Sequence, residues 1–234
     1  MTRPAQDTRA TRMSSNPEPL RHQALAALAQ HRIATSSQLR QMLCPHSTRQ
    51  VMSRVLSKLR TEGFIDWTTL PEANRSHTKA WYLTPDGARL TRNLPVLRGR
   101  QSYPITSNTA ASLKASHTLA VVRAHLAFTE DARLFQYEAQ PVGRRRQAAA
   151  GPAWLRWYPV FPRVLFVLTG ASRSRLENRI SDLQAMVTQH PLVAALAREV
   201  RLGAAVLEDI EQHGPAQALW VPLAGGKPRP WTDL

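Results

Sequence analysis

Apolar side chains recur at helical spacing in three successive short segments near the start of the chain. The first segment covers residues 20–31 and is followed by a short break at residues 32–34. A T-x-x-Q capping box then begins a second helix over residues 36–43, which Pro45 ends. Three helices joined by connectors this short predict a helix-turn-helix core.

The third helix has two faces of different character. It starts after Ser47 or Thr48, either of which can cap it, runs to about residue 61 and leaves through Gly63. One face is apolar and is expected to pack inward: Val51, Val55, Leu56 and Leu59. The opposite face is polar or basic: Arg49, Gln50, Ser53, Arg54, Ser57 and Lys58. A solvated helix face usually mixes charges of both signs, whereas a recognition helix needs such a one-signed face in the DNA major groove. On this helix alone, a plain surface helix stays an open alternative.

The segment after the third helix predicts a wing. Residues 64–68 read as a strand, and a second strand returns at residues 81–83 after a polar stretch that carries Arg75, His77 and Lys79. A fourth helix follows, with Thr84 as its cap and Pro85 and Asp86 in its first turn. A helix followed by a strand, a basic tip and a strand is typical of a winged helix, whose tip commonly lies along the phosphate backbone.

The second half of the chain alternates helices and strands. Helices are predicted at residues 111–129, 172–187, 192–199 and 205–212, and strands at residues 134–142, 164–169 and 218–222. The fold class is therefore α+β, with an N-terminal winged helix-turn-helix followed by a small α/β domain. The predicted parts are a disordered basic arm (1–18), the winged helix (19–93), a linker (94–110), the α/β domain (111–223) and a flexible tail (224–234).

Charge strengthens the indication of a nucleic-acid partner. The chain of 234 residues carries 31 Lys and Arg against 16 Asp and Glu, a formal net charge of +15. A surplus of that size indicates a polyanionic partner. The surplus is uneven, because 17 of the basic but only 6 of the acidic residues lie at or before Lys114. A general bias of the genome toward arginine does not explain this asymmetry.

Cysteine and hydropathy patterns indicate an intracellular setting. Cys44 is the only cysteine, so an internal disulfide is excluded and a cysteine-based metal site is not expected. The most apolar run, residues 164–168, is far too short to span a bilayer. We therefore expect a cytoplasmic protein associated with the nucleoid or a plasmid, without cofactor, metal, small-molecule ligand or membrane contact.

Several of these segments resemble one protein family. The runs IATSSQLRQMLCP, TRQVMSRVLSKLRTEGFI and WYLTPDGARL resemble the N-terminal half of the replication-relaxation family, and residues 116–128 and 162–180 resemble its later helix, strand and helix. The resemblance implies an actinobacterial winged-helix protein of a plasmid or mobile element. The family's second domain is nuclease-like and usually carries a P-D and an E-hydrophobic-D element. Here no carboxylate stands between Glu138 and Glu177, so the second domain is shortened and we expect no catalysis.

The function predicted from the sequence is binding of double-stranded DNA, in replication control or in transcription regulation. The predicted DNA-binding residues are Thr48, Arg49, Gln50, Ser53, Arg54, Ser57, Lys58, Arg75, His77 and Lys79. A homodimer is a further expectation, with the helices at residues 172–187 and 205–212 as alternative interfaces. Two other functions stay open: a metal-dependent nickase or nuclease using Glu130, Asp131 and Glu138, and an adaptor whose winged helix binds protein.

Overall fold

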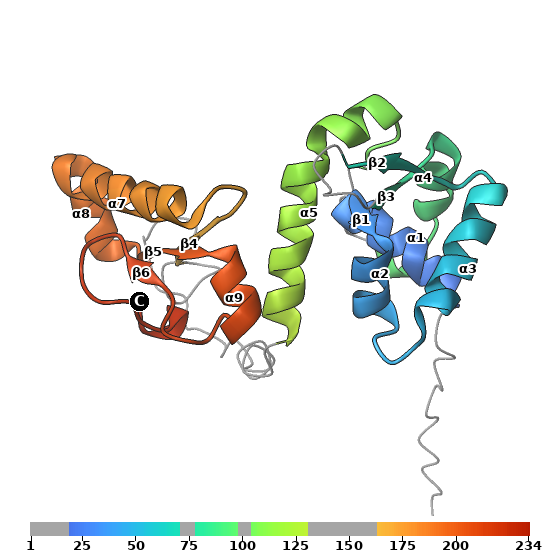
Figure 1. Cartoon of the computed structure of the whole chain (residues 1–234). Coiled ribbons are helices and arrows are strands. Elements are labelled where there is room, and N and C mark those ends of the chain that lie inside the picture. Colours follow the sequence, from blue (N-terminus) through green and yellow to red (C-terminus); the bar gives the residue numbers. More distant parts are fainter. Residues whose placement is uncertain (1–18, 71–77, 98–103, 131–162) are drawn as a thin grey trace, which may run out of the picture. The chain divides into compact units, whose positions relative to one another are not determined.

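The computed structural model describes residues 19–70, 78–97, 104–130 and 163–234 (Figure 1). The chain forms two compact units, Met1–Leu113 and Lys114–Leu234. The predicted arm (1–18), the tip of the predicted wing with Arg75 and His77, and the predicted strand at residues 134–142 lie outside the described residues. No described helix has the length and apolar character needed to cross a membrane.

The first unit has the element order of a winged helix (Figure 1). Its elements are α1 (Leu20–His31), β1 (Ile33–Thr35), α2 (Ser36–Leu43), α3 (Arg49–Thr61), β2 (Ile65–Thr69), β3 (Lys79–Leu83), α4 (Pro85–Thr91) and η1 (Pro95–Leu97). The three strands form an antiparallel sheet in the order β1-β3-β2. The predicted break at residues 32–34 is in fact the start of β1, entered through Arg32 at φ 69°. The α+β winged-helix fold predicted from the sequence is confirmed.

The core of the first unit is built where the helices meet the sheet. Its fully buried members include Leu25 and Leu28 of α1, Leu39 of α2, Met52, Leu56 and Leu59 of α3, and Leu83 of β3. The predicted apolar face of α3 is wrong at one position, because Val51 is 37% exposed while Met52 is 1% exposed. Met52 therefore takes the place of Val51 in the inward stripe, because it shares a face with Leu56 at i+4 and Leu59 at i+7.

Two turns of this unit depend on particular residues. The capping box of α2 is confirmed, because the Gln38 N–H donates to Thr35 Oγ1 (3.2 Å) and the Thr35 N–H donates to Gln38 Oε1 (2.9 Å). Thr48 is the N-cap residue of α3, but its side chain makes no capping hydrogen bond. Gly87 in α4 lies so close to the Phe64 carbonyl oxygen that a Cβ there would stand 2.0 Å away. Only glycine fits at that position.

The second unit combines a small sheet with helices. Its elements are the part of α5 (Asn108–Glu130) from Lys114 onward, β4 (Val164–Leu168), α7 (Arg173–Gln189), α8 (Pro191–Glu199), β5 (Leu202–Val206), α9 (Leu207–His213), β6 (Val221–Pro222) and η3 (Trp231–Asp233). β4 pairs with β5 in parallel and β5 with β6 antiparallel. The predicted strand at residues 164–169 and the helices at 172–187 and 192–199 are confirmed with slightly shifted ends.

The predictions for residues 202–222 need correction. The helix predicted over residues 205–212 begins only at Leu207, because residues 202–206 form β5. Gly203, Ala204 and Ala205 carry no strand pattern of their own, so pairing with β4 and β6 decides their conformation. The strand predicted at residues 218–222 is only Val221–Pro222, with Trp220 forming a separate bridge to Arg229.

The predicted tail and linker are packed rather than free. Arg229 exchanges two backbone hydrogen bonds with Trp220, at 3.0 and 3.1 Å, and the C-terminal Leu234 is 8% exposed in the core beside Trp220. Within the predicted linker, Leu97 and Ile105 are buried. The boundary between the two units falls inside α5, so the linker prediction is wrong in its position.

Candidate nucleic-acid interface

The polar face of α3 is exposed as predicted. Arg49, Gln50, Ser53, Arg54, Ser57 and Lys58 are all exposed, as is the cap residue Thr48. The orientation follows from the burial of Met52, Leu56 and Leu59 on the opposite side of the helix. α3 contains no acidic residue, so its exposed face presents hydrogen-bond donors and positive charge without a carboxylate.

A groove of about 540 Å³ runs beside this face. Three elements line it: the start of α2, the first half of α3 and the base of the wing at β3. The lining residues are Thr35, Ser36, Ser37, Arg49, Gln50, Ser53, Thr78 and Lys79. None of these residues is acidic. The structure thus brings four predicted residues into the groove, namely Arg49, Gln50, Ser53 and Lys79, and leaves Arg54, Ser57 and Lys58 farther along the exposed face of α3.

The start of α2 contributes groups that the sequence analysis did not include. The N–H groups of Ser36 and Ser37 lie in the first helical turn, where they have no acceptor within the helix. Helix N-termini attract anions because these N–H groups and the helix dipole point outward. Ser36 Oγ accepts a hydrogen bond from the indole Nε1 of Trp81, at 2.8 Å. The capping box at Thr35 was the sequence signal that could have placed this helix start at the interface.

Lys79 at the base of the wing lies over an aromatic ring. Its Nζ is 4.6 Å from the ring centroid of Trp67, and the Arg60 guanidinium carbon is 5.5 Å from the same centroid. Arg60 Nε also donates to Asp66 Oδ1, at 3.1 Å. Cations above an indole face are attracted by its quadrupole without losing their charge. Lys79 is therefore held at the edge of the groove by an aromatic ring and not by a carboxylate.

The described carboxylates of the first unit are paired with arginines and do not line the groove. Among the described residues, Glu62 pairs with Arg21 at 2.8 Å, Asp66 pairs with Arg60, and Asp86 pairs with Arg89. Each carboxylate is thus compensated by an arginine of its own. The basic side chains Arg49, Arg54 and Lys58 carry no such partner among the ion pairs of the described residues, so their charge is available on the surface.

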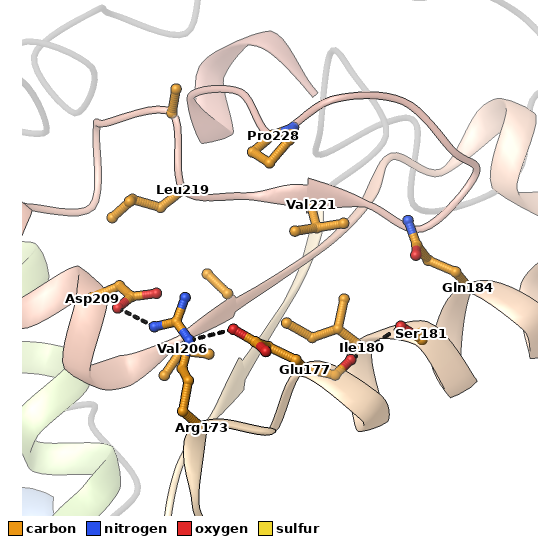
Figure 2. Close-up of a pocket in the computed structure, with 12 residues that line it drawn as sticks. Arg173, Glu177, Ile180, Ser181, Gln184, Val206, Asp209, Leu219, Val221 and Pro228 are labelled. Atoms are coloured by element: carbon orange, nitrogen blue, oxygen red, sulfur yellow. Dashed lines mark hydrogen bonds and ion pairs between the residues drawn. The ribbon is translucent and has the colours of Figure 1, made fainter. Parts of the chain in front are cut away.

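The second unit holds a smaller pocket of about 380 Å³, between α7, α9 and the strands (Figure 2). Arg173 lies at its polar end and pairs with Glu177 (2.7 Å) and Asp209 (2.5 Å). The hydrogen bonds to Glu177 and then to Asp209 raise the pKa of Arg173. Ile180, Val221 and Pro228 contribute apolar surface. The carboxylates in this pocket are therefore neutralised by the arginine between them.

A second arginine compensates the neighbouring carboxylates. Arg123 of α5 pairs with Glu211 (2.5 Å) and Glu208 (3.2 Å), and Thr169 Oγ1 donates to Glu208 at 2.6 Å. Burial acts to raise the pKa of Glu208, but the hydrogen bonds from Thr169, the backbone and Arg123 outweigh it and lower the pKa. Within the described residues, no group of three or more His, Cys, Asp or Glu side chains could hold a metal ion. Of the carboxylates predicted for a nuclease, Glu130 ends α5, whereas Asp131 and Glu138 lie outside the described residues.

The fold and the groove together define a winged helix-turn-helix protein. The replication-relaxation family matches residues 25–159, which is more than half of the chain, and the chain belongs to this family. The matched range begins within α1 and covers the rest of the winged helix and α5. It ends before residues 162–180, so the resemblance of that segment to the family stays a prediction.

Two solved structures share part of their fold with this chain. The chain is similar to the zinc-responsive MarR family member ZitR of Lactococcus lactis (15% identity, TM-score 0.28, covering 54% of this chain and 74% of that one). It is also similar to Bacillus subtilis PadR, solved in complex with operator DNA (18% identity, TM-score 0.31, covering 60% of this chain and 86% of that one). Similarity at this level is too low to assign a partner. No curated protein matches the chain.

Proposed function

We propose that this protein binds double-stranded DNA through the groove and the exposed polar face of α3. One observation carries the proposal: a face without carboxylates on α3 adjoins both the N-terminus of α2 and the cationic base of the wing. The major groove of duplex DNA is wide enough to hold an α-helix. N–H groups and cations on either side of that helix can then contact the phosphates. Membership of the replication-relaxation family supports the same proposal.

The proposal assigns two kinds of contact. Arg49, Gln50, Ser53 and Arg54 meet base edges, because their side chains carry the donors and acceptors that distinguish base pairs. Phosphates are contacted by Ser57, Lys58 and Lys79, by the start of α2, and by Arg75 and His77. Thr48, at the start of α3, lies beside these contacts. The base contacts give sequence preference, whereas the phosphate contacts give affinity and salt dependence.

The proposed role is control of replication or of transcription on a plasmid or other mobile element of an actinobacterium. The family description, replication-relaxation, supports a link to replicating DNA. We propose that the protein acts in the cytoplasm as a non-catalytic homodimer, since one winged helix reads only a short site and two-fold operators are common. The pairing of Glu177, Asp209, Glu208 and Glu211 with two arginines supports the absence of catalysis, because metal-dependent cleavage needs free carboxylates.

A salt titration tests the proposal against the protein-adaptor alternative. Binding of the full chain to a labelled random duplex is measured by fluorescence anisotropy over a range of potassium chloride concentrations. With six or more phosphate contacts, log K should fall against log salt with a slope of about −5 or steeper. Absence of binding at low salt, or binding without salt dependence, would contradict DNA binding.

A further inference from the structure

Two tryptophans stand opposite each other at the base of the wing. Trp67 of β2 and Trp81 of β3 are direct partners in the antiparallel register, so their side chains lie on the same face of the sheet. Trp81 is 6% exposed, and Trp67 is half-buried against the same core. Each of them contacts a different edge of the DNA-binding groove.

We propose that this tryptophan pair positions the phosphate-contacting groups on the two edges of the groove. Trp81 acts through Ser36 at the start of α2, and Trp67 acts through Lys79 at the base of the wing. The inference rests on the proposed DNA binding and adds two positioning residues that themselves touch no DNA.

The first contact fixes the direction of a hydroxyl group. An indole N–H is a donor only, so in the bond between Trp81 Nε1 and Ser36 Oγ (2.8 Å) the serine oxygen is the acceptor. The hydroxyl proton of Ser36 is then left to donate to another group. Ser36 lines the groove beside the outward N–H groups of the α2 N-terminus. Trp81 thus prepares Ser36 to donate to a phosphate oxygen.

The second contact restrains a flexible cation. A lysine side chain has many rotamers, and this rotamer entropy is lost when the side chain is held in one place on binding DNA. The ring of Trp67, 4.6 Å from Lys79 Nζ, restrains the side chain before DNA arrives and leaves its charge intact. Asp66, the nearest carboxylate on β2, is bound to Arg60 and therefore does not draw Lys79 away. Trp67 thus holds Lys79 ready at the groove edge.

Crossed double-mutant cycles on duplex DNA separate this role from general stabilisation. The single variants are Trp67→Leu, Lys79→Gln, Trp81→Phe and Ser36→Ala, and all four pairwise combinations of a tryptophan with a polar variant are measured. We expect coupling of about two- to fivefold in affinity between Trp67 and Lys79, and a similar coupling between Trp81 and Ser36. The pairs Trp67 with Ser36 and Trp81 with Lys79 should be independent, so that their effects multiply.

The control for packing is Trp67→Phe, which keeps an aromatic face. Trp67→Phe should retain most of the interaction with Lys79 that Trp67→Leu removes. Its own cycle with Lys79→Gln should therefore show a smaller coupling than the cycle of Trp67→Leu with Lys79→Gln. If all four combinations multiply, or if all four couple equally, the positioning role is wrong. A wild-type protein that binds no duplex contradicts the proposed function instead, so the two failures are distinguishable.

Two measurements on the DNA-free protein need neither tryptophan variant, so they hold even where those variants do not fold. Ring currents from Trp67 should shift the ε-methylene protons of Lys79 upfield in the NMR spectrum of the wild-type chain. The Trp81 indole N–H should exchange with solvent faster in Ser36→Ala than in the wild type, since its acceptor is gone. Unshifted lysine protons, or unchanged indole exchange, would overturn the corresponding half of the inference.

Discussion

In the proposed interface, Arg54 of α3 and Lys79 of β3 are assigned different roles, one in sequence preference and one in charge. Arg54 is exposed on the polar face of α3, opposite the buried stripe, whereas Lys79 sits on Trp67 at the groove edge. A bidentate arginine contact to guanine distinguishes bases, while a lysine near a phosphate does not. The two cations therefore differ in what their loss should do.

Arg54→Ala should relax sequence preference, with a loss of about 1–3 kcal/mol on the preferred site and little change on random duplex. Lys79→Ala should weaken binding to all sequences alike and reduce the salt slope by about 1. Competition binding with a selected site and a random duplex measures both effects. Arg92→Ala is the matched control, because Arg92 is exposed outside the groove. Equal behaviour of the three variants would contradict the assignment of contacts.

Gly87 of α4 allows the backbone to approach the turn between α3 and β2 closely, because it has no side chain. A Cβ at this position would meet the Phe64 carbonyl oxygen at 2.0 Å, and the Thr84 N–H donates to that same oxygen at 3.0 Å. Gly87→Ala should destabilise the protein by about 1–3 kcal/mol, measured by urea unfolding. Ala88→Ser, one residue further along α4, is the control and should change stability much less. A Gly87→Ala protein as stable as the wild type would refute the close approach.

At the scale of elements, periodicity predicted the winged helix well because its helices carry core residues at helical spacing, and α2 and α4 also carry their own caps. The capping box at Thr35, the cap at Thr84 and Gly63 are all local signals, and the structure confirms each of them. β5 was missed because Gly203, Ala204 and Ala205 acquire a strand conformation only through pairing. The groove was predicted only in part, since the contact of α2 with β3 through Trp81 joins residues that are 45 positions apart.

The contact of α5 with α9 is an electrostatic link with a defined pH dependence. The pKa of Glu208 is lowered from its usual 4.5, so the stabilisation from its ionised form is present above that value and is lost as pH falls through the lowered pKa. The stability difference between wild type and Glu208→Gln should therefore be full near neutral pH and vanish in acid. Urea unfolding at several pH values measures it, with Glu177→Gln as a control away from Arg123. A difference that grows in acid would contradict the link.

At the scale of the whole molecule, we expect the protein to bind DNA without cleaving it. The sequence predicted no catalysis from missing carboxylates, and four carboxylates of the second unit, Glu177, Glu208, Asp209 and Glu211, pair with Arg123 or Arg173. Apart from the local pair Arg173–Glu177, the sequence could not foresee these pairs, because they join α5 to α9 and α7 to α9 across long stretches of chain.

We expect no nicking of supercoiled plasmid in the presence of Mg²⁺ or Mn²⁺, at protein concentrations that saturate binding. Gel electrophoresis of the plasmid measures this directly. Cleavage that is lost in the Glu130→Gln, Asp131→Asn or Glu138→Gln variants would contradict the non-catalytic role and establish the nickase alternative.

Binding through α3 is most directly tested with two triple variants that remove the same charge. The first replaces Arg49, Arg54 and Lys58 by alanine, and the second replaces Arg92, Arg175 and Arg179, which are exposed and lie outside the groove. Affinity for the selected, preferred duplex site is measured for both at equal salt. The first triple should lose affinity by at least about tenfold and reduce the salt slope by about 0.9 for each phosphate contact removed, while the second changes little. Equal losses in both, or none in the first, would contradict DNA binding through the α3 face.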